Sequence, residues 1–391
     1  MRRSAIKTIA ILSNTSWSVY NFRRGLIRRL SAEGYRVLIV APPDQYTAQL
    51  QEEPCLFFPV TLSRHKVNPL HDFRYAFQVF SILKKYKPDL MISYTIKPNI
   101  YGQLAARMLG IPRLAVVTGL GYLFIAQNWK TRIVKTLYRH SFKRAERVWF
   151  LNKDDLAIFL SDGTITKAQA GYLPGEGVDI NYFKPMPTTP VSERPLCFLY
   201  AGRLIKEKGV PEFVRAAQII KSAHPGIQFK IAGFIEREAP GAIQLADIKA
   251  WEASGLITYK GPKEDIRPTL AEADCVVLPT YYREGVPRIL LEAASMGIVI
   301  VGTNSPGSKD IVIEGENGFL CQEREPVQLA HTLTRIIQLP ETERRKLGIR
   351  GRAIVAANFR EEIIIDRYLR LLEQVLGCPA DQRTKAPIKL H

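Results

Sequence analysis

Short apolar runs alternate with longer segments of helical periodicity through the first half of the chain. Strands of a parallel sheet are covered by helices on both faces and are therefore apolar along their whole length. The pattern predicts a doubly wound α/β domain with helices on both sides of a mostly parallel sheet. The predicted strands are Thr8–Ser13, Arg36–Ala41, Leu56–Val60, Asp89–Tyr94, Leu114–Thr118 and Val148–Asn152.

A proline-rich stretch at Lys184–Pro195 interrupts this alternation, which then restarts. The second series predicts another Rossmann-like domain, and beyond Pro326 the pattern becomes helical, with breaks near Pro340 and Asn358. We expect domains at 1–188 and 189–358, a C-terminal helix at 359–377 that returns to the first domain, and a mobile tail at 378–391. The second set of predicted strands is Leu196–Ala201, Gln228–Ala232, Ile257–Gly261, Cys275–Pro279, Ile298–Val301 and Gly318–Cys321.

Length and composition agree with two globular cores. The chain has 391 residues, of which 46% are apolar and 24% charged. No apolar run approaches the roughly 20 residues that a membrane-spanning helix requires, and Lys7 interrupts the apolar stretch that a secretory signal would need. The five cysteines lack metal-binding spacing, so we expect no metal site and a reducing cytosol. Cys197, Cys275 and Cys321 lie in apolar strand-like runs and are expected to be buried thiols.

The positive charge is concentrated in the first half of the chain. Residues 1–188 contain 27 Lys and Arg against 12 Asp and Glu, whereas residues 189–391 contain 28 against 25. A domain with such a charge attracts an anionic partner, which could be nucleic acid, an acidic membrane surface or a phosphorylated substrate.

The first chemically informative stretch, Ala201–Gly209, lies between a predicted strand and a predicted helix. Loops at the carboxyl ends of parallel strands commonly bind anions, and the guanidinium of Arg203 with the ammonium of Lys208 would suit a diphosphate that approaches the backbone at Gly202. An ordinary basic turn is the alternative.

The second stretch, Tyr281–Ala293, also follows a predicted strand. Pro287 is expected in the first turn of a helix, which would leave the amides of Val286, Arg288 and Ile289 for a phosphate. Glu284 lies in the preceding loop, where a solvated acid is the alternative.

Glu292 lies among Leu290, Leu291, Ala293 and Ala294. A carboxylate in such surroundings needs hydrogen-bond donors. Sugar or ribose hydroxyls would serve, and so would a salt bridge to a neighbouring helix.

These two stretches, with seven residues between Glu284 and Glu292, resemble family 4 retaining glycosyltransferases of the GT-B fold. A subgroup similar to the bacterial enzyme that adds N-acetylgalactosamine to diacetylbacillosamine on undecaprenyl diphosphate shares further segments. These are Tyr20–Arg23, Lys97–Gly102, Thr118–Tyr122, Gly177–Asp179 and Glu284–Gly297. The resemblance implies two Rossmann-like domains that face each other across a cleft.

The resemblance also implies roles for individual residues. Arg203 and Lys208 would hold the donor diphosphate, Glu284 the transferred sugar and Glu292 the ribose, so that Arg203, Lys208 and Glu284 act in catalysis. The co-substrate would be a UDP-sugar, with no cofactor and no metal. The other expected donor contacts are Gly202, Gly285, Val286, Pro287, Arg288, Ile289, Asp265 and Ile266, the last two at the base.

The chain departs from this family at two places. A Gly-Gly pair common after the first strand is replaced by Ser13–Tyr20, so Asn14, Thr15 and Ser16 become the candidate phosphate contacts there. The acceptor-side loops contain no histidine. Lys97, Asn99, Thr118 and Gly119 are the substitute candidates, for each of which a structural role is the alternative.

A basic segment at Asn128–Arg144 repeats apolar residues at helical spacing and is flanked by lysines and arginines. This pattern is typical of a helix at a membrane interface, but also of a core-facing helix with a solvated basic side. With the arginine-rich Arg23–Arg29, it leads us to expect a peripheral protein at the inner face of the cytoplasmic membrane. The expected acceptor is a polyprenyl-diphosphate-linked sugar in surface polysaccharide or glycoprotein glycan synthesis.

Other classes explain fewer of these features. A nucleic-acid-binding protein would account for the charge, but no recognised binding motif is present, and we expect no nucleic-acid partner. A dehydrogenase would need a third glycine after Gly119–Gly121 or Gly175–Gly177. A nucleotide-sugar 2-epimerase of similar architecture, or a glycosyltransferase with a soluble acceptor, stays open.

Overall fold

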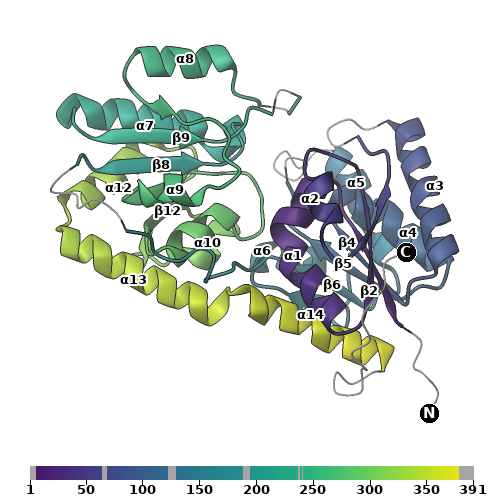
Figure 1. Ribbon diagram of the computed structural model, residues 1–391. Helices are drawn as coiled ribbons and strands as arrows, with labels where there is room; N and C mark the ends of the chain where they lie inside the picture. The colour runs from purple at the N-terminus through teal and green to yellow at the C-terminus, as the bar shows by residue number, and fades with distance from the viewer. Residues whose placement is uncertain are drawn as a thin grey trace. The chain divides into compact units, whose positions relative to one another are not determined.

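The computed structural model describes residues 6–63, 68–121, 129–187, 194–236, 238–239 and 241–377, without the side chain of Lys130. The chain forms two compact units (Figure 1). The first contains the residues up to Glu176 and those from Glu361 onward, and the second is Gly177–Arg360. The expected tail at 378–391 lies outside the described residues.

The first unit contains a seven-stranded sheet in the order β3-β2-β1-β4-β5-β6-β7, and every neighbouring pair is parallel. In β1, an interior strand, Ile9 pairs with Val37 on one side and Leu90 on the other. The strands are β1 (Thr8–Leu12), β2 (Arg36–Ala41), β3 (Leu56–Pro59), β4 (Leu90–Tyr94), β5 (Arg113–Val117), β6 (Arg147–Phe150) and β7 (Ala170–Tyr172).

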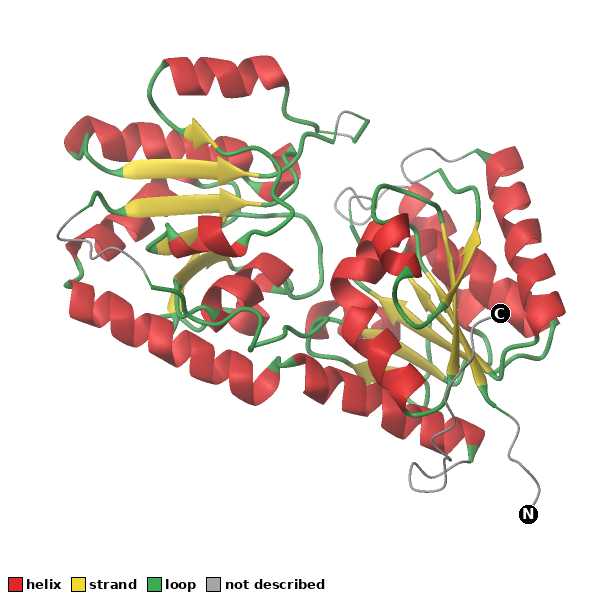
Figure 2. Cartoon of the chain, in the orientation of Figure 1, coloured by secondary structure: helices red, strands yellow, loops and turns green. Residues whose placement is uncertain are grey.

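Helices cover both faces of this sheet (Figure 2). Leu26 of α1 and Tyr368 of α14 belong to the core on one face, whereas Val79 of α3 and Phe142 of α5 belong to the cores on the other. The helices are α1 (Ser16–Ala32), α2 (Thr47–Gln51), α3 (Pro69–Tyr86), α4 (Gln103–Met108), α5 (Trp129–Phe142), α6 (Lys153–Ser161) and α14 (Glu361–Leu376), with a π-helical turn η1 (Pro98–Gly102) before α4.

The second unit repeats this architecture with a six-stranded parallel sheet in the order β10-β9-β8-β11-β12-β13. Its strands are β8 (Cys197–Ala201), β9 (Gln228–Ala232), β10 (Thr258–Tyr259), β11 (Cys275–Leu278), β12 (Val299–Thr303) and β13 (Gly318–Cys321). Its helices are α7 (Val210–Ala223), α8 (Leu245–Ala253), α9 (Arg267–Ala271), α10 (Arg288–Ser295), α11 (Ser308–Ile311), α12 (Pro326–Gln338) and α13 (Glu341–Asn358), with a 3₁₀ turn η4 (Lys206–Lys208) before α7.

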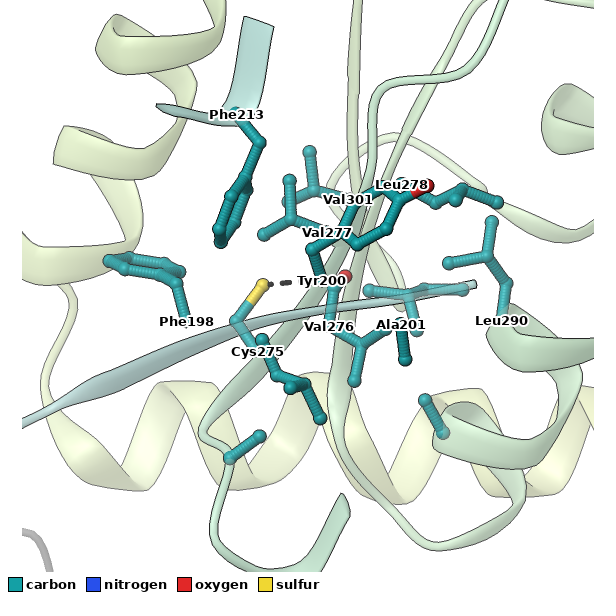
Figure 3. Packing of buried hydrophobic residues seen from close by; sticks show 14 of the residues in the cluster. Phe198, Tyr200, Ala201, Phe213, Cys275, Val276, Val277, Leu278, Leu290 and Val301 are labelled. Carbon is teal, nitrogen blue, oxygen red and sulfur yellow. Dashed lines mark hydrogen bonds between the residues drawn. The ribbon is translucent and has the colours of Figure 1, made fainter. Parts of the chain in front are cut away.

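The core of the second unit is built from apolar strand residues and the inward faces of its helices. Phe198 of β8 stacks on Phe229 of β9, and Phe213 of α7 meets Phe229 edge-on. Figure 3 shows Phe198 and Phe213 beside residues of β11, including Cys275. Burial of this apolar surface is the main stabilising term for the unit.

The doubly wound fold predicted from the sequence is confirmed in both units. The three-residue strand β7 was missed because Ala170-Gly171-Tyr172 has neither the length nor the apolar character of a buried strand.

The division between the units precedes the proline-rich stretch, at Glu176 rather than at 188. The segment after Gly177 belongs to the second unit by its contacts, because the amide of Val178 donates to the carbonyl of Phe359 at 2.9 Å. The Ser295 hydroxyl also donates to the carbonyl of Phe183 at 2.6 Å.

Among the helices of the described residues, none combines the length and the apolar character needed to cross a bilayer.

Candidate active site

Two loops at the carboxyl edge of the second sheet carry Arg203, Lys208 and Glu284, the three residues expected to act in catalysis. The first follows β8 and leads through Arg203 and η4 to α7. Gly209 ends this loop with a φ of 79°, and a Cβ at this position would collide with the carbonyl of Pro279. Glycine is therefore needed here both for its left-handed backbone and for close approach to the second loop.

The second loop, which follows β11, is fastened to the first by backbone hydrogen bonds. The carbonyl oxygen of Glu207 accepts from the amides of Tyr281 and Tyr282, at 2.9 and 3.0 Å, and from the hydroxyl of Thr280 at 3.2 Å. Because β8 and β11 are parallel neighbours, both loops start from the same edge of the sheet. Side chains distant in sequence are thereby brought together.

Lys208 and Glu284 form a close ion pair across these loops. The Lys208 ammonium donates to both carboxylate oxygens of Glu284, at 2.6 and 2.5 Å, and both side chains are largely buried. Burial lowers the pKa of Lys208, and the carboxylate of Glu284 opposes this shift. A charge-assisted pair of this kind is strong enough to fix the positions of both groups.

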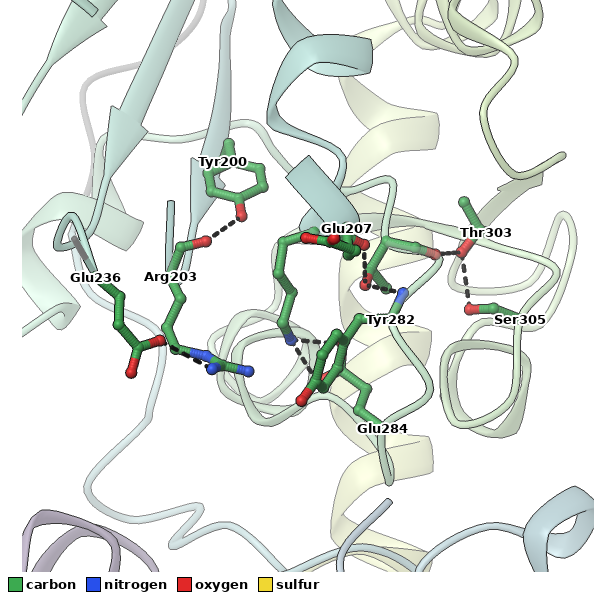
Figure 4. Close-up of polar contacts among 10 residues, drawn as sticks. Tyr200, Arg203, Glu207, Glu236, Tyr282, Glu284, Thr303 and Ser305 are labelled. Atoms are coloured by element: carbon green, nitrogen blue, oxygen red, sulfur yellow. Dashed lines mark hydrogen bonds and ion pairs between the residues drawn. The ribbon is translucent and has the colours of Figure 1, made fainter. Parts of the chain in front are cut away.

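Arg203 lies beside this pair and contacts Glu236 and Tyr282 (Figure 4). Its guanidinium donates to Glu236 at 3.0 Å and lies 5.2 Å from the centre of the Tyr282 ring. Burial would lower the pKa of Arg203, but Tyr282 and Glu236 together raise it above its ordinary value. The guanidinium is therefore held as a cation.

Tyr282 and Glu236 are residues of this site to which sequence reasoning assigned no role. The ammonium of Lys208 lies 5.6 Å from the centre of the Tyr282 ring, so the same aromatic ring is close to both cations. Attraction between a cation and the face of an aromatic ring favours this arrangement. The signal in the sequence that could have pointed to Tyr282 was its position two residues before Glu284.

The charges of this cluster are balanced in the structure. Arg203 and Lys208 are matched by Glu236 and Glu284. A diphosphate that bound here would therefore compete with carboxylates for the two cations. Competition of this kind would free a carboxylate to accept hydrogen bonds from other groups of the same ligand.

Glu292 finds its partner within its own helix rather than on a neighbouring one. The Arg288 Nε donates to Glu292 at 3.0 Å, one turn away in α10. Burial raises the pKa of Glu292 to about 7, although Arg288 acts in the opposite direction. This carboxyl can therefore exchange a proton near neutral pH.

The expected position of Pro287 in the first helical turn was wrong by one residue. Pro287 is the N-cap of α10, and its carbonyl accepts from the amides of Leu290 and Leu291. Gly285, Val286 and Pro287 are buried, whereas Arg288 and Ile289 are partly exposed. The first turn of α10 therefore begins directly after the three buried residues, as a phosphate site at this helix start would require.

The two base-side candidates lie at the start of α9. Arg267 donates to both carboxylate oxygens of Asp265, at 2.9 and 2.8 Å, and lowers the pKa of this acid. Ile266 caps α9 and packs against the core of the second unit. The Arg267 guanidinium also covers the ring of Tyr182, at 3.6 Å from its centre.

Two of the three candidates after β1, Thr15 and Ser16, make contacts at the start of α1. Thr15 accepts from the amide of Ser18 at 3.0 Å, and the hydroxyl and amide of Ser16 both donate to the carbonyl of Pro42. The amide of Trp17 donates to the carboxylate of Asp44 at 2.8 Å. The helix terminus that would hold a phosphate already has acceptors, and partly exposed Asn14 is the remaining candidate.

The acceptor-side candidates Lys97 and Asn99 have partners within the first unit. Asn99 is fully buried, accepts from Ser93 at 2.7 Å and donates to the carbonyl of Val116 at 2.9 Å. Lys97 donates to the buried carboxylate of Asp72 at 2.6 Å. These contacts favour structural roles for both residues.

The other two acceptor-side candidates, Thr118 and Gly119, are partly exposed at the carboxyl end of β5. This is the sheet edge at which ligands of doubly wound domains bind. Gly119 has a φ of 127°.

The basic segment at α5 packs mostly into the core. Tyr138 and Phe142 are buried, and Val134 and Leu137 pack against the same core, which leaves Ile133 half exposed. The five apolar residues on which the interfacial pattern rested therefore largely face inward.

The arginines of α1 are likewise engaged within the first unit. Arg23 is buried against Glu176 at 2.7 Å, and Arg28 pairs with Glu53 at 2.6 Å.

Among the described residues, no group of three or more His, Cys, Asp or Glu side chains is close enough to hold a metal ion. Cys197, Cys275 and Cys321 are buried free thiols, as the sequence predicted.

Both halves of the chain match glycosyltransferase family models. Residues 21–170 match the model described as "Glycosyl transferase 4-like domain", and residues 186–353 match "Glycosyl transferases group 1". The chain is therefore a glycosyltransferase of the GT-B fold. It combines a glycosyl transferase 4-like domain in its first half with a group 1 glycosyltransferase domain in its second half.

Known proteins resemble the chain over most of its length. It is 28% identical to the Campylobacter jejuni N,N'-diacetylbacillosaminyl-diphospho-undecaprenol alpha-1,3-N-acetylgalactosaminyltransferase, over 94% of the chain and 99% of that protein. It is 26% identical to the Escherichia coli UDP-Gal:alpha-D-GlcNAc-diphosphoundecaprenol alpha-1,3-galactosyltransferase, over 76% and 79%. The Anabaena protein HepE in complex with UDP-glucose superimposes with a TM-score of 0.75 at 18% identity, covering 94% of the chain and 99% of HepE.

Proposed function

We propose that this glycosyltransferase moves a hexose or N-acetylhexosamine from a UDP-sugar onto a sugar carried by a polyprenyl diphosphate. The observation that carries the proposal is the cluster of Arg203, Lys208 and Glu284, at the edge of a parallel sheet, where a nucleotide diphosphate is expected to bind. The second unit would then bind the donor and the first the acceptor.

The donor would be held by exchange of ionic partners. The diphosphate would take Arg203 and Lys208 from Glu236 and Glu284, and the released Glu284 would accept hydrogen bonds from hydroxyls of the transferred sugar. Glu292, which lies one turn beyond Arg288 in α10, would hold the ribose. Asp265 and Ile266 would lie toward the base, and the first turn of α10 toward the phosphates.

The chemistry would be a retaining transfer that requires no metal. The bond between the anomeric carbon and the phosphate oxygen breaks, and its electron pair goes to the leaving UDP. The acceptor hydroxyl attacks the same face of the anomeric carbon and passes its proton to the leaving phosphate. Lys208 and Arg203 would stabilise the charge that develops on that phosphate, an effect worth a few kcal/mol for each such group, roughly.

The acceptor assignment is supported by the relatives and by charge. The names of the C. jejuni and E. coli relatives both specify diphosphoundecaprenol-linked acceptors, and the E. coli name also specifies a UDP-linked donor. Residues 1–188 contain the excess of positive charge that an anionic lipid surface or a diphosphate would attract. We place the reaction in surface polysaccharide or glycoprotein glycan synthesis, at the inner face of the cytoplasmic membrane.

The decisive experiment supplies purified protein with a panel of radiolabelled UDP-sugars and either bacterial membranes or a synthetic polyprenyl-diphosphate-sugar. We expect label from one UDP-sugar in the butanol-extractable lipid, and none with Lys208→Ala. Lys249→Ala, at an exposed lysine of α8, is the matched control and should transfer normally. Label that enters only a water-soluble glycan would overturn the lipid-linked acceptor, and isomerisation of the UDP-sugar without acceptor would indicate an epimerase.

A further inference from the structure

Helix α3 carries a row of large apolar side chains that face away from the protein. Leu70, Phe73 and Phe77 are 81%, 72% and 63% exposed. Their spacing of three and four residues places them on one side of the first two turns. We call these three residues the α3 apolar row. Figure 1 shows α3 at the margin of the first unit.

The opposite side of α3 is fixed to the first unit, so the helix cannot turn to hide this row. Asp72, Tyr75, Val79 and Leu83 are buried, and the ring of Tyr75 meets that of Tyr101 edge-on at 6.2 Å. The buried Asp72 carboxylate accepts from Lys97 and from the Tyr101 hydroxyl. These contacts set the rotation of α3 and thereby the outward direction of the apolar row.

The charged side chains exposed on α3 are all basic. They are Arg74, Lys84 and Lys85. The single acid of the helix is Asp72, which is buried and paired with Lys97. A helix that presents aromatic and aliphatic side chains among basic ones has the two features that bind anionic bilayers, namely apolar insertion and attraction to headgroups.

We propose that the outward face of α3 is the surface by which this enzyme attaches to an anionic lipid bilayer. The apolar row would enter the boundary between headgroups and acyl chains, while Arg74, Lys84 and Lys85 contact lipid phosphates. The inference rests on the proposed function in one respect, because a lipid-linked acceptor would require the enzyme to work at a membrane. A protein partner would be expected to bring acidic groups to a face whose exposed charges are all basic.

The test is flotation of the purified full chain with vesicles of phosphatidylcholine containing 30% phosphatidylglycerol, and with vesicles of phosphatidylcholine alone. We expect binding to the anionic vesicles and a loss of about tenfold or more in partition for Phe73→Gln with Phe77→Gln. Arg74→Gln with Lys84→Gln should weaken binding to the anionic vesicles only, and more strongly at low salt. Ile349→Gln, at a 70% exposed isoleucine of α13 in the second unit, is the matched control and should bind normally.

Three further outcomes separate this inference from its rivals. Unchanged flotation of the Phe73/Phe77 variant would overturn it. If the wild type self-associates in sedimentation and this variant does not, while flotation of the variant persists, the result would instead assign the row to a second copy of the chain. Transfer to a short-chain acceptor in detergent should be equal in wild type and variant. If neither protein transfers sugar to this acceptor while flotation is normal, the result would count against the proposed function alone.

Discussion

The ammonium of Lys208 lies 2.6 and 2.5 Å from the two carboxylate oxygens of Glu284, although 76 positions separate these residues in the chain. The pair exists because the loops after β8 and β11 start from neighbouring strands and are joined at the carbonyl of Glu207. A nucleotide diphosphate that binds at this edge has to replace Glu284 as the partner of Lys208. The two residues should therefore differ in their effects on donor binding.

Lys208→Ala should weaken UDP binding, whereas Glu284→Ala should leave it unchanged or strengthen it. Loss of a charge-assisted hydrogen bond costs about 1.5–3 kcal/mol, or roughly 10- to 100-fold in Kd. Removal of Glu284 instead frees Lys208 for the diphosphate. Both variants should lose transfer by about 100-fold or more. Calorimetric titration with UDP and a transfer assay measure the two effects, after circular dichroism has confirmed folding.

A parallel loss of UDP affinity in both variants would contradict this division of roles. It would mean that the ion pair acts as one structural unit that keeps the loops in place.

Tyr282 should contribute to donor binding through its ring and its hydroxyl. Tyr282→Phe removes the hydroxyl that interacts with Arg203 but keeps the ring beside both cations, so we expect UDP affinity to fall about 3- to 10-fold. Tyr282→Ala also removes the ring and should cost more. Tyr281→Phe is the neighbouring control, because its ring faces Arg324 instead. Equal UDP affinities for the two Tyr282 variants would argue against a role for the ring.

Glu292 should make the stability of the enzyme depend on pH near neutrality. Its pKa of about 7 in the folded protein exceeds the ordinary 4.5, so the folded state binds more protons than the unfolded state between these values. The free energy of unfolding should therefore fall as pH rises from about 5 to 7.5, by up to a few kcal/mol at about 1.4 kcal/mol per pKa unit. Glu292→Gln should abolish this contribution.

Thermal unfolding of wild type and Glu292→Gln from pH 5 to 8 checks this prediction. The Tm of the variant relative to wild type should increase by a few degrees over this range. A constant difference would reflect only the loss of the contact with Arg288, and would show that the carboxyl is ionised throughout.

Thr15→Ala should affect stability but not donor binding. Thr15 caps α1 by accepting from the amide of Ser18, and removal of such a cap costs about 1 kcal/mol. UDP affinity should be unchanged, because the first amides of α1 already donate to Pro42, Asp44 and Thr15 itself. Weaker UDP binding at an unchanged Tm would instead restore Thr15 as a donor contact.

The residues that the structure brings together at the edge of the second sheet could be selected in the sequence by their charge and by their position after a strand. Arg203, Lys208 and Glu284 follow predicted strands directly, and parallel strands bring such loops to one edge. Tyr282 was missed because nothing in a linear motif indicates that a ring will lie beside two cations. Asn99 and Thr15 are candidates in the sequence because they stand in loops that carry ligand contacts in the family that the chain resembles, and the local sequence does not show that Ser93 and the amide of Ser18 are their partners.

The sequence by itself determined the two doubly wound domains, the helical C-terminal region and the loops that carry the charged residues. Hydrophobic periodicity reports which faces of each element are buried, and this information is local. The tertiary structure alone decided the partners: Glu236 for Arg203, Arg288 for Glu292 and Asp44 for the start of α1. It also decided that the apolar side of α5 faces inward, whereas α3 has the α3 apolar row outside in addition to its buried apolar side. An amphipathic pattern gives the direction of an apolar face relative to its own helix, but the packing of other elements determines what covers it.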